Sequence, residues 1–257
     1  MEETSRIQDR FKGAEYMPLL NSLSITMVGQ GGIGSPFALA LSRAHPAAIF
    51  AYEYDIVEEH NLGGQIFSLS DVGEGKAEAT QSRLEAYSDY YNFTPLGELL
   101  EDSEVTPTIF MCVDSNPARY LAFQTWKKMG ETKGWTHEVE LDDIKYIMPN
   151  VYFDGRLSFN QVEIYCVTEH TAAHHEATNL HLTNNNLTEG ECTTKSNPEV
   201  GIVTGGLMFT WYRNFLQNVI DANILGVTAK TVPYKWTFNL SNGDINSYGK
   251  HANFPSQ

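Results

Sequence analysis

Two short stretches of the chain carry residues whose types and spacing suit nucleotide binding. The first, residues 29–34, reads Gly-Gln-Gly-Gly-Ile-Gly, and the second begins at Glu53, 24 residues after Gly29. Glycine lets a backbone approach a phosphate closely, and a helix that follows would offer free N–H groups and the positive end of its dipole. A carboxylate at Glu53 can accept hydrogen bonds from ribose hydroxyls. The plainer alternative is that Glu53 caps a loop at the end of a strand.

Lys76 and Asp114 are two further charged residues at positions where phosphate chemistry would use them. Asp114 ends an apolar run at 108–113, and Lys76 opens an amphipathic segment at 76–87. A strand-end carboxylate can bind a metal ion, and it can equally cap the helix that follows it. Lys76 by itself could be a solvated lysine at the start of a helix. Taken alone, the two residues leave both alternatives open.

The elements that must position these residues alternate between strands and helices. Short apolar runs predict strands at 23–28, 47–52 and 108–113, and helical patterns lie at 35–44, 76–87 and 116–129. Such alternation is typical of a doubly wound α/β fold with a mostly parallel sheet flanked by helices. Ligands of such sheets lie at the carboxyl ends of the strands. We therefore expect the glycine turn, Glu53 and Asp114 to meet at one edge of the sheet.

The second half of the chain has a less regular pattern. It predicts strands at 146–153 and 161–167 on either side of Asp154-Gly155-Arg156, a helix at 171–181, a long apolar helix at 201–220, and a hairpin formed by 231–240 and 244–248. This mixture predicts an α+β extension at the C-terminal end of the fold. No internal repeat or flexible linker interrupts the sequence, which favours one continuous domain.

Composition narrows the classes of partner and compartment. The chain has 257 residues, of which 42% are hydrophobic, and a formal net charge of −15. A strongly acidic surface repels phosphate backbones, so we expect no nucleic-acid partner. No apolar run is long enough to span a bilayer and the N-terminus does not resemble a signal peptide, so we expect no membrane association. Three widely spaced cysteines favour the reducing cytoplasm, and the lack of a Cys-x-x-Cys pair predicts no structural zinc.

Four motifs in a fixed order give the chain a family resemblance. They are Gly-Gln-Gly-Gly-Ile-Gly-Ser at 29–35, Glu-Tyr-Asp-Ile-Val-Glu-Glu-His-Asn-Leu-Gly-Gly-Gln at 53–65, Asp-Val-Gly-Glu-Gly-Lys-Ala at 71–77, and Asp-Ser-Asn-Pro-Ala-Arg at 114–119. Together they resemble the ThiF/MoeB/ubiquitin-activating (E1-like) superfamily over residues 22–125, with a weaker continuation to about 220. The resemblance implies a Rossmann-like fold and an enzyme that uses ATP and Mg²⁺ to adenylate a carboxylate. The substrate is often the C-terminal glycine of a ubiquitin-like protein, and some members then transfer the acyl group to a thiol.

The residues at 1–21 predict a polar N-terminal arm that becomes helical. The resemblance implies that residues 22–257 form a single E1-like adenylation domain. Within that domain, 22–150 would bind the nucleotide and 151–257 would contact the substrate or a second subunit. Members of the family are often homodimers, and we expect a homodimer here.

The resemblance assigns roles on the nucleotide side of the expected site. The phosphate turn would be lined by four glycines, which are Gly29, Gly31, Gly32 and Gly34. Glu53 would hold the ribose, although the family usually has aspartate there. Asp55 and Asn61 would shape the site, and Asn61 would face the phosphates together with Gln65.

The resemblance assigns the remaining roles to charged residues. Lys76 would neutralise phosphate charge, and Asp114 would bind the magnesium ion. Arg119 matches an arginine that the family carries at the start of the helix after that aspartate. A metal ion with fixed cations would offset the repulsion between the attacking carboxylate and the α-phosphate.

Gly64 is the main departure from the family pattern, because the family has a phosphate-contacting arginine at this position. Another cation could replace it. Arg6 and Arg10 lie where homodimeric members carry an arm that reaches the partner's nucleotide, and Arg156 and Lys195 are other candidates. The alternative is a scaffold that binds nucleotide without turning it over. The family's second aspartate is Met111 here, and its paired zinc-binding cysteines are absent.

Cys192 raises a separate question, because it lies in the polar stretch 191–196 close to Lys195. A nearby cation can lower a thiol pKa, so Cys192 could accept the acyl group. It could equally be an incidental cysteine. A nicotinamide-dependent oxidoreductase is a third class of function. It would use the glycine turn and Glu53, but the motifs at 61–65 and 114–119 favour adenylation over that hypothesis.

Overall fold

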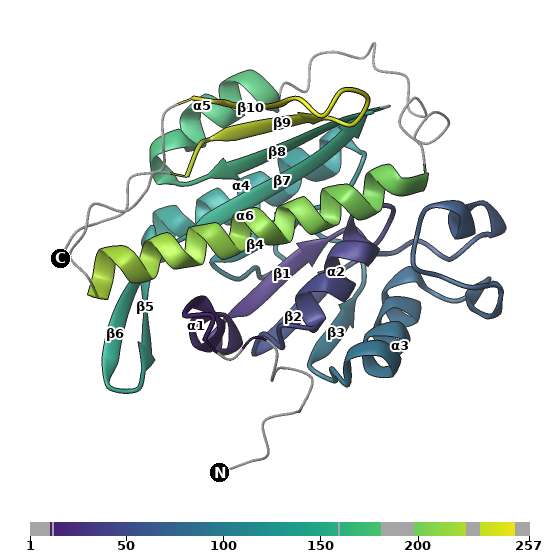
Figure 1. Cartoon of the computed structure of the whole chain (residues 1–257), viewed down its shortest axis with the longest axis horizontal. Coiled ribbons are helices and arrows are strands. Elements are labelled where there is room, and N and C mark those ends of the chain that lie inside the picture. The colour runs from purple at the N-terminus through teal and green to yellow at the C-terminus, as the bar shows by residue number, and fades with distance from the viewer. Residues whose placement is uncertain (1–10, 12, 159, 181–197, 225–231, 250–257) are drawn as a thin grey trace.

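An eight-stranded mixed sheet forms the centre of the protein, in the strand order β10-β9-β8-β7-β4-β1-β2-β3 (Figure 1). The computed structural model describes residue 11 and residues 13–158, 160–180, 198–224 and 232–249. Adjacent strands are parallel from β3 to β7, and the pairs from β7 to β10 are antiparallel. The expected doubly wound, mostly parallel α/β fold with an α+β extension is confirmed.

The parallel strands are short and mostly apolar. They are β1 (Ser24–Val28), β2 (Ala48–Tyr52), β3 (Phe93–Leu96), β4 (Thr108–Met111) and β7 (Val151–Ser158). The antiparallel extension consists of β8 (Gln161–Val167), β9 (Lys235–Asn239) and β10 (Ile245–Tyr248). All four residues of β4 are buried, which is the pattern of a strand covered by helices on both faces of a sheet.

Helices cover both faces of the sheet. One face packs against α1 (Tyr16–Ser22), α2 (Gly34–Ser42), α3 (Lys76–Ser88) and α6 (Pro198–Ile224), and the other against α4 (Asn116–Lys133) and α5 (Glu169–Asn179). α6 lies in front of the middle of the sheet and packs against β7, β8 and α2 (Figure 1). Among the described residues, no helix combines the length and apolarity that a membrane span requires.

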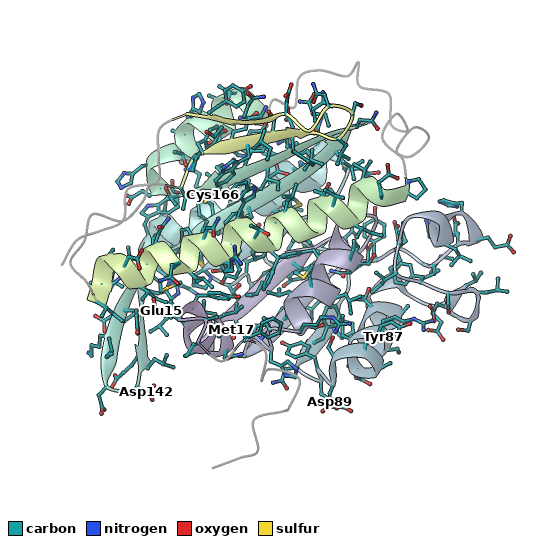
Figure 2. All side chains as sticks on the ribbon, in the orientation of Figure 1. Glu15, Met17, Tyr87, Asp89, Asp142 and Cys166 are labelled. Carbon is teal, nitrogen blue, oxygen red and sulfur yellow. The ribbon has the colours of Figure 1, made fainter. Side chains whose placement is uncertain are left out.

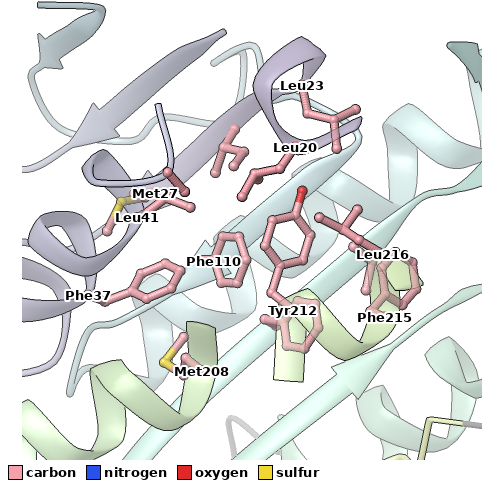
Figure 3. Close-up of a cluster of buried hydrophobic side chains, with 14 of the residues drawn as sticks. Leu20, Leu23, Met27, Phe37, Leu41, Phe110, Met208, Tyr212, Phe215 and Leu216 are labelled. Atoms are coloured by element: carbon pink, nitrogen blue, oxygen red, sulfur yellow. The ribbon is translucent and has the colours of Figure 1, made fainter. Parts of the chain in front are cut away.

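The main core lies between the sheet and α6. The ring of Phe110 on β4 is 4.5 Å from that of Phe37 on α2 and 5.0 Å from that of Tyr212 on α6, measured between centroids (Figure 3). Gly205 allows this packing, since a Cβ there would lie 2.8 Å from the backbone nitrogen of Phe37. α6, from the second half of the chain, is therefore packed directly on the helix that follows the glycine turn.

A small two-stranded hairpin stands apart from the central sheet. It consists of β5 (Thr136–Leu141) and β6 (Ile144–Pro149), joined by a two-residue turn in which Asp142 and Asp143 have φ values of 50° and 63° (Figure 2). Two consecutive residues with positive φ are the mark of a type I′ hairpin turn. Two short 3-10 helices, η2 (Glu59–Gly63) and η3 (Leu69–Asp71), complete the loop between β2 and α3.

Two expectations for the second half are wrong in detail. The single strand expected at 146–153 is divided at Asn150 into β6 and β7. Pro149 ends β6, and the side chain of Asn150 turns away to donate to the Gly134 carbonyl oxygen at 2.8 Å. As a result, Asp154-Gly155-Arg156 lies inside β7 rather than between strands. The division of the chain at residues 150 and 151 into two functional halves stays a prediction.

Candidate active site

The glycine turn follows β1 and is closed by contacts that only glycine permits. Gly29 has a φ of 92°, and a Cβ on it would lie 2.7 Å from Cγ1 of Val113, in the segment after β4. A Cβ on Gly34 would collide with the Gly29 carbonyl oxygen. The turn is therefore folded back on itself and pressed against the residues that lead to Asp114.

The outer side of the same turn is open. A Cβ on Gly31 would meet no atom within 4 Å, and one on Gly32 would meet only the Gly64 carbonyl oxygen, at 3.9 Å. α2 begins at Gly34, so the N-terminal end of a helix follows this open backbone. An exposed glycine backbone at a helix N-terminus is an arrangement that suits an anionic phosphate group.

Glu53 links the end of β2 to the glycine turn. Its Oε2 accepts the backbone N–H of Gln30 at 2.7 Å, and its Oε1 accepts those of Tyr54 and Asp55 at 2.8 and 2.9 Å. Glu53 therefore caps the loop at the end of β2, as the plainer alternative from the sequence predicts. A carboxylate has about four acceptor sites, so three N–H bonds leave room for a ligand hydroxyl.

Asn61 and Gln65 lie in the loop between β2 and α3. Asn61 is buried, and its Oδ1 accepts the backbone N–H of Glu58 at 2.8 Å, so it shapes the loop. The backbone nitrogen of Ile66 is 3.4 Å from Oγ of Ser35 on α2, which ties the loop to the glycine turn. The side-chain oxygen of Gln65 is buried without a donor among the described residues. An orphaned buried oxygen beside the open turn is consistent with a polar ligand there.

Lys76 begins α3 and is held by Asp55. Its Nζ donates to Oδ2 of Asp55 at 2.9 Å, and its backbone nitrogen donates to the Asp55 carbonyl oxygen at 2.8 Å. The side chain of Lys76 is 10% exposed, whereas that of Asp55 is 51% exposed. The ammonium group is therefore fixed in one position instead of moving freely in solvent.

An ion pair between Asp71 and Arg83, which the sequence does not predict, holds the same loop. Asp71 on η3 accepts hydrogen bonds from Arg83 on α3 and, at 2.7 Å, from the backbone N–H of Ser68. Burial acts to raise the pKa of Asp71, but the bonds from Arg83 and Ser68 outweigh it and keep this pKa below its usual value. This ion pair fixes the segment from Ser68 to Asp71, which leads to Lys76.

Asp114 and Arg119 lie beyond the end of β4. The carboxylate of Asp114 is exposed and makes no hydrogen bond or ion pair within the described part of the chain. Arg119 is buried, and its Nη1 donates to the Asp114 carbonyl oxygen at 3.2 Å while Nη2 donates to that of Val113. In this structure Arg119 supports the backbone under Asp114, and direct contact of Arg119 with a nucleotide stays a prediction.

Arg119 also belongs to a buried charged cluster centred on Asp154. Asp154 is fully buried and accepts hydrogen bonds from Nε of Arg119 at 3.1 Å and from Nε and Nη2 of Arg156 at 2.8 and 2.6 Å. Burial acts to raise the pKa of Asp154, but Arg156 and Arg119 outweigh it, and the pKa stays below its usual value. The sequence offers no signal for this cluster, because Arg119 lies 35 residues from Asp154 and only Arg156 is its neighbour in the chain.

Carboxylates dominate the exposed electrostatics of this edge. Tyr54 follows Glu53 and is 72% exposed. Its pKa is raised chiefly by Asp55, with contributions from partial burial and from Glu53, Glu98 and Asp114. Negative charge from the ends of β2, β3 and β4 therefore converges here, and a phosphate would need cations to offset it.

The described cations near the turn are already paired, Lys76 with Asp55, Arg83 with Asp71 and Arg119 with Asp154. Gly64 itself has open space around it. The other residues expected to contribute, Arg6, Arg10, Cys192 and Lys195, lie outside the described residues.

The acidic edge could hold Mg²⁺ through a single protein carboxylate, with the other ligands supplied by water and phosphate. No group of three His, Cys, Asp or Glu side chains suited to a metal ion occurs in the described segments. Mg²⁺ commonly uses one or two carboxylates and completes its shell with water and substrate phosphates. The exposed carboxylate of Asp114, which has no partner among the described residues, meets that requirement next to the open turn.

The site thus combines an open glycine turn, a fixed carboxylate at Glu53, a fixed ammonium at Lys76 and an exposed carboxylate at Asp114. The four groups come from the carboxyl ends of β1, β2 and β4 and from the start of α3. This is a set that can bind a nucleotide and, with a divalent ion, stabilise charge at its phosphates.

Comparisons with known proteins identify the family of the chain. The family described as "ThiF family" matches residues 5–133. The ubiquitin-like modifier-activating enzyme 5 of Dictyostelium discoideum is 28% identical over 134 residues, which cover 45% of this chain and 35% of the relative. The sulfur carrier protein adenylyltransferase of Thermus thermophilus is 39% identical over 75 residues, or 29% of this chain and 28% of the relative. The matched part thus spans about a third of the length of these curated relatives.

Solved structures share the fold over a longer stretch. A crystal structure of E. coli MccB with ATP superposes with a TM-score of 0.64 at 13% identity and covers 97% of this chain and 72% of that one. A structure of PaaA gives a TM-score of 0.61 at 13% identity, with 92% of this chain and 67% of that one covered. At this identity the likeness establishes the fold alone.

Proposed function

The chain belongs to the ThiF family, and on that premise we propose that it is an adenylyltransferase that uses ATP and Mg²⁺ to activate a carboxylate. The observation that carries the proposal is the open backbone at Gly31 and Gly32, which lies between the carboxylates of Glu53 and Asp114. The open turn would receive the phosphates at the N-terminus of α2. Adenylyltransferase names among the relatives support the same reaction class.

The nucleotide would lie across the strand ends. Glu53 would accept hydrogen bonds from the ribose, with its orientation already set by the N–H groups of Gln30, Tyr54 and Asp55. The phosphates would lie on the glycine turn, with Asn61 and Gln65 beside them. Gly29 and Gly34 close the turn and keep the backbone of Gly31 and Gly32 exposed.

The reaction proposed is a displacement at the α-phosphate. An oxygen of the substrate carboxylate forms a bond to the α-phosphorus, the bond to the bridging oxygen breaks, and pyrophosphate leaves with the electron pair. Lys76 would neutralise part of the negative charge, and Asp114 would hold the divalent ion. A bound Mg²⁺ supplies charge neutralisation on the phosphate oxygens. Arg119 would keep Asp114 in position through its bond to the Asp114 carbonyl oxygen.

The proposed substrate is the C-terminal carboxylate of a small protein, such as a ubiquitin-like protein, or of a peptide. Names of relatives refer to ubiquitin-like modifiers and to a sulfur carrier protein, and MccB has been solved with N-formylated MccA. We further propose a cytoplasmic homodimer in which Arg6 or Arg10 supplies a cation that Gly64 does not. Transfer of the acyl group to Cys192 is an additional proposal that concerns residues outside the described part.

The test is ATP–pyrophosphate exchange with a candidate protein or peptide carboxylate present. We expect exchange that requires Mg²⁺ and is lost in Asp114→Ala. Glu140→Ala, which removes an exposed carboxylate on β5, is the matched control and should exchange like the wild type. Full exchange in Asp114→Ala would overturn the role of Asp114. A reductant-sensitive thioester that is absent in Cys192→Ala would support the acyl-transfer step, and exchange without any thioester would overturn that step.

A nucleotide-binding scaffold without turnover is the second candidate. Gly64 and the pairing of Lys76, Arg83 and Arg119 favour it, because each of these three cations near the glycine turn is already bonded to a carboxylate. In that case Mg²⁺·ATP would bind, and exchange would stay at background with every carboxylate tried. Tight NADH binding without ATP binding would contradict both candidates.

A further inference from the structure

The cluster around Asp154 carries a net positive charge. One carboxylate, that of Asp154, faces two guanidinium groups, those of Arg119 and Arg156. His175 is the fourth member, with its Nε2 3.8 Å from Oδ2 of Asp154. Burial lowers the pKa of His175 to about 4, so this side chain is neutral near pH 7. Glu163, opposite Arg156 on β8, is itself bonded to Lys235 at 2.9 Å and so does not change this balance. The cluster therefore keeps one more positive than negative charge.

This charge lies at the same edge of the sheet as the candidate active site. The parallel register pairs Met111, the last residue of β4, with Asp154 on β7. Asp114 follows Met111 by three residues and Arg156 follows Asp154 by two, so both extend beyond that pair in the same direction. Arg119 joins the two positions, since it binds both Asp154 and the Asp114 carbonyl oxygen.

Arg156 is the member of the cluster whose side chain is partly exposed. Its Nε and Nη2 bind Asp154, and Nη2 also donates to the Asn179 carbonyl oxygen at 3.2 Å. The guanidinium carbon lies 4.9 Å from the centre of the Tyr165 ring, which fixes the plane of the group. Nη1 has no acceptor within the described residues, and the side chain is 21% exposed. A fixed guanidinium with free N–H donors is a ready binding group for a carboxylate.

The order of groups along the edge indicates which ligand group would reach Arg156. From β2 to β7 the edge carries Glu53, then the glycine turn, then Asp114, and finally Arg156. In an in-line displacement the attacking and leaving oxygens lie on opposite sides of the phosphorus. On the proposed function, Asn61, Gln65 and Lys76 lie on the β2 side, where pyrophosphate would leave. The attacking carboxylate would then approach from the side of β4 and β7.

We propose that Arg156 binds the carboxylate of the substrate and orients it toward the α-phosphate. The inference rests on the proposed function and extends it, because it assigns the acceptor side of the site to a named residue. Arg156 stays protonated and exchanges no proton in the reaction. It holds the carboxylate oxygen that forms the new bond to phosphorus. The positive charge of the cluster offsets the repulsion between that carboxylate and the acidic edge.

The test measures binding in the absence of turnover. The protein is saturated with Mg²⁺ and α,β-methylene-ATP, which cannot be cleaved at the reacting position. Diglycine and its C-terminal amide are then titrated by calorimetry or ligand-detected NMR. Since a charge-assisted hydrogen bond to a carboxylate changes affinity by about tenfold or more, the wild type should bind the acid at least about tenfold more tightly than the amide.

Arg156→Gln should lose this preference for the acid, while its affinity for Mg²⁺·α,β-methylene-ATP stays within about twofold of the wild type. Arg213→Gln, at an exposed arginine on α6, is the matched control and should keep the preference. If Arg156→Gln does not fold, Arg156→Lys keeps Asp154 paired, and we expect it to weaken acid binding by about threefold, because lysine lacks the planar fork. Wild-type acid binding in that variant would overturn the inference.

The outcomes separate this inference from the function on which it rests. A folded Arg156→Gln that still prefers the acid overturns the role of Arg156. A wild type that binds Mg²⁺·α,β-methylene-ATP but binds acid and amide equally overturns it as well, and leaves nucleotide binding standing. A wild type that does not bind the nucleotide analogue overturns the proposed function itself.

Discussion

The two sides of the candidate site are built on different physical principles. On the side of β1 and β2, the binding surface is backbone: Gly31 and Gly32 are open, and charged side chains nearby are paired one to one. On the side of β7, the surface depends on side chains, with Asp154 buried beneath two arginines. The side of β1 and β2 can bind phosphates through open backbone and the N-terminal end of the α2 dipole. The side of β7 supplies the excess of positive charge.

The difference shows where each side is vulnerable. A turn that binds phosphate through open glycine backbone loses this binding when a side chain fills the space or when a neighbouring helix displaces the turn. A buried ionic cluster fails when a partner is removed, because the remaining charge loses both its water and its counterion. We therefore expect changes on the β7 side to affect folding most, and changes at the turn to affect ligand binding most.

The largest expected effect comes from Asp154→Asn. The substitution keeps the shape but leaves the buried Arg119 and the partly buried Arg156 without the carboxylate that binds both, and breaking a buried ion pair costs about 3–5 kcal/mol. Urea denaturation should show a loss of that size in the free energy of unfolding. Glu140→Gln, on an exposed strand position, should stay within about 0.5 kcal/mol of the wild type. A loss below about 1 kcal/mol in Asp154→Asn would mean that the cluster is not held by Asp154.

The second effect is a pH dependence that comes from His175. Burial lowers its pKa to about 4 in the folded protein, below the usual value of 6.5, so the unfolded chain takes up the proton first as the pH falls. Stability is complete above pH 6.5 and declines toward pH 4, by up to about 1.4 kcal/mol per pH unit. Burial also lowers the pKa of His137, so the check is the difference in slope between the wild type and His175→Asn. Equal slopes would show that His175 is protonated when folded.

A pair of glycines on α6 tests the contact between that helix and the glycine turn. A Cβ on Gly201 would collide with the Gly32 carbonyl oxygen, whereas one on Gly206 would meet no atom within 4 Å. Gly201→Ala should destabilise the protein by about 1–3 kcal/mol through overpacking and weaken binding of Mg²⁺·α,β-methylene-ATP. Gly206→Ala should stabilise the helix by up to about 1 kcal/mol and leave binding unchanged. Thermal unfolding and calorimetry measure both, and equal behaviour of the two variants would contradict the contact.

The smallest expected effect is a gain of affinity in Gly64→Arg. Gly64 has a φ of −150° and open space around it, so an arginine can be accepted without a backbone change. A cation next to the turn should raise the affinity for Mg²⁺·α,β-methylene-ATP by about tenfold. Gly63→Arg adds the same charge at an equally open neighbouring position. A gain in Gly64→Arg no larger than in Gly63→Arg would show that only net charge matters.

The sequence predicts the first side of the site better than the second, for a physical reason. The glycine turn, Glu53 and Asp114 each follow a short apolar strand, and local patterns are enough to place strand ends at one edge. The Asp154 cluster depends on the register between β4 and β7, which no local pattern contains. The sequence also does not predict β3, because this strand has only four residues and one of them is Pro95, which lacks a backbone N–H and is tolerated only in an edge strand.

The central claim is that the open backbone at Gly31 binds the phosphates of a nucleotide, and Gly31→Val tests it most directly. A Cβ there would meet no described atom within 4 Å, so we expect the variant to unfold within a few degrees of the wild type, which thermal unfolding checks. Its side chain would occupy the space assigned to the phosphates. Calorimetric titration with Mg²⁺·α,β-methylene-ATP should show binding to the wild type and a loss of at least about a hundredfold in Gly31→Val, or about 3 kcal/mol. Equal affinity in the two proteins would contradict the claim.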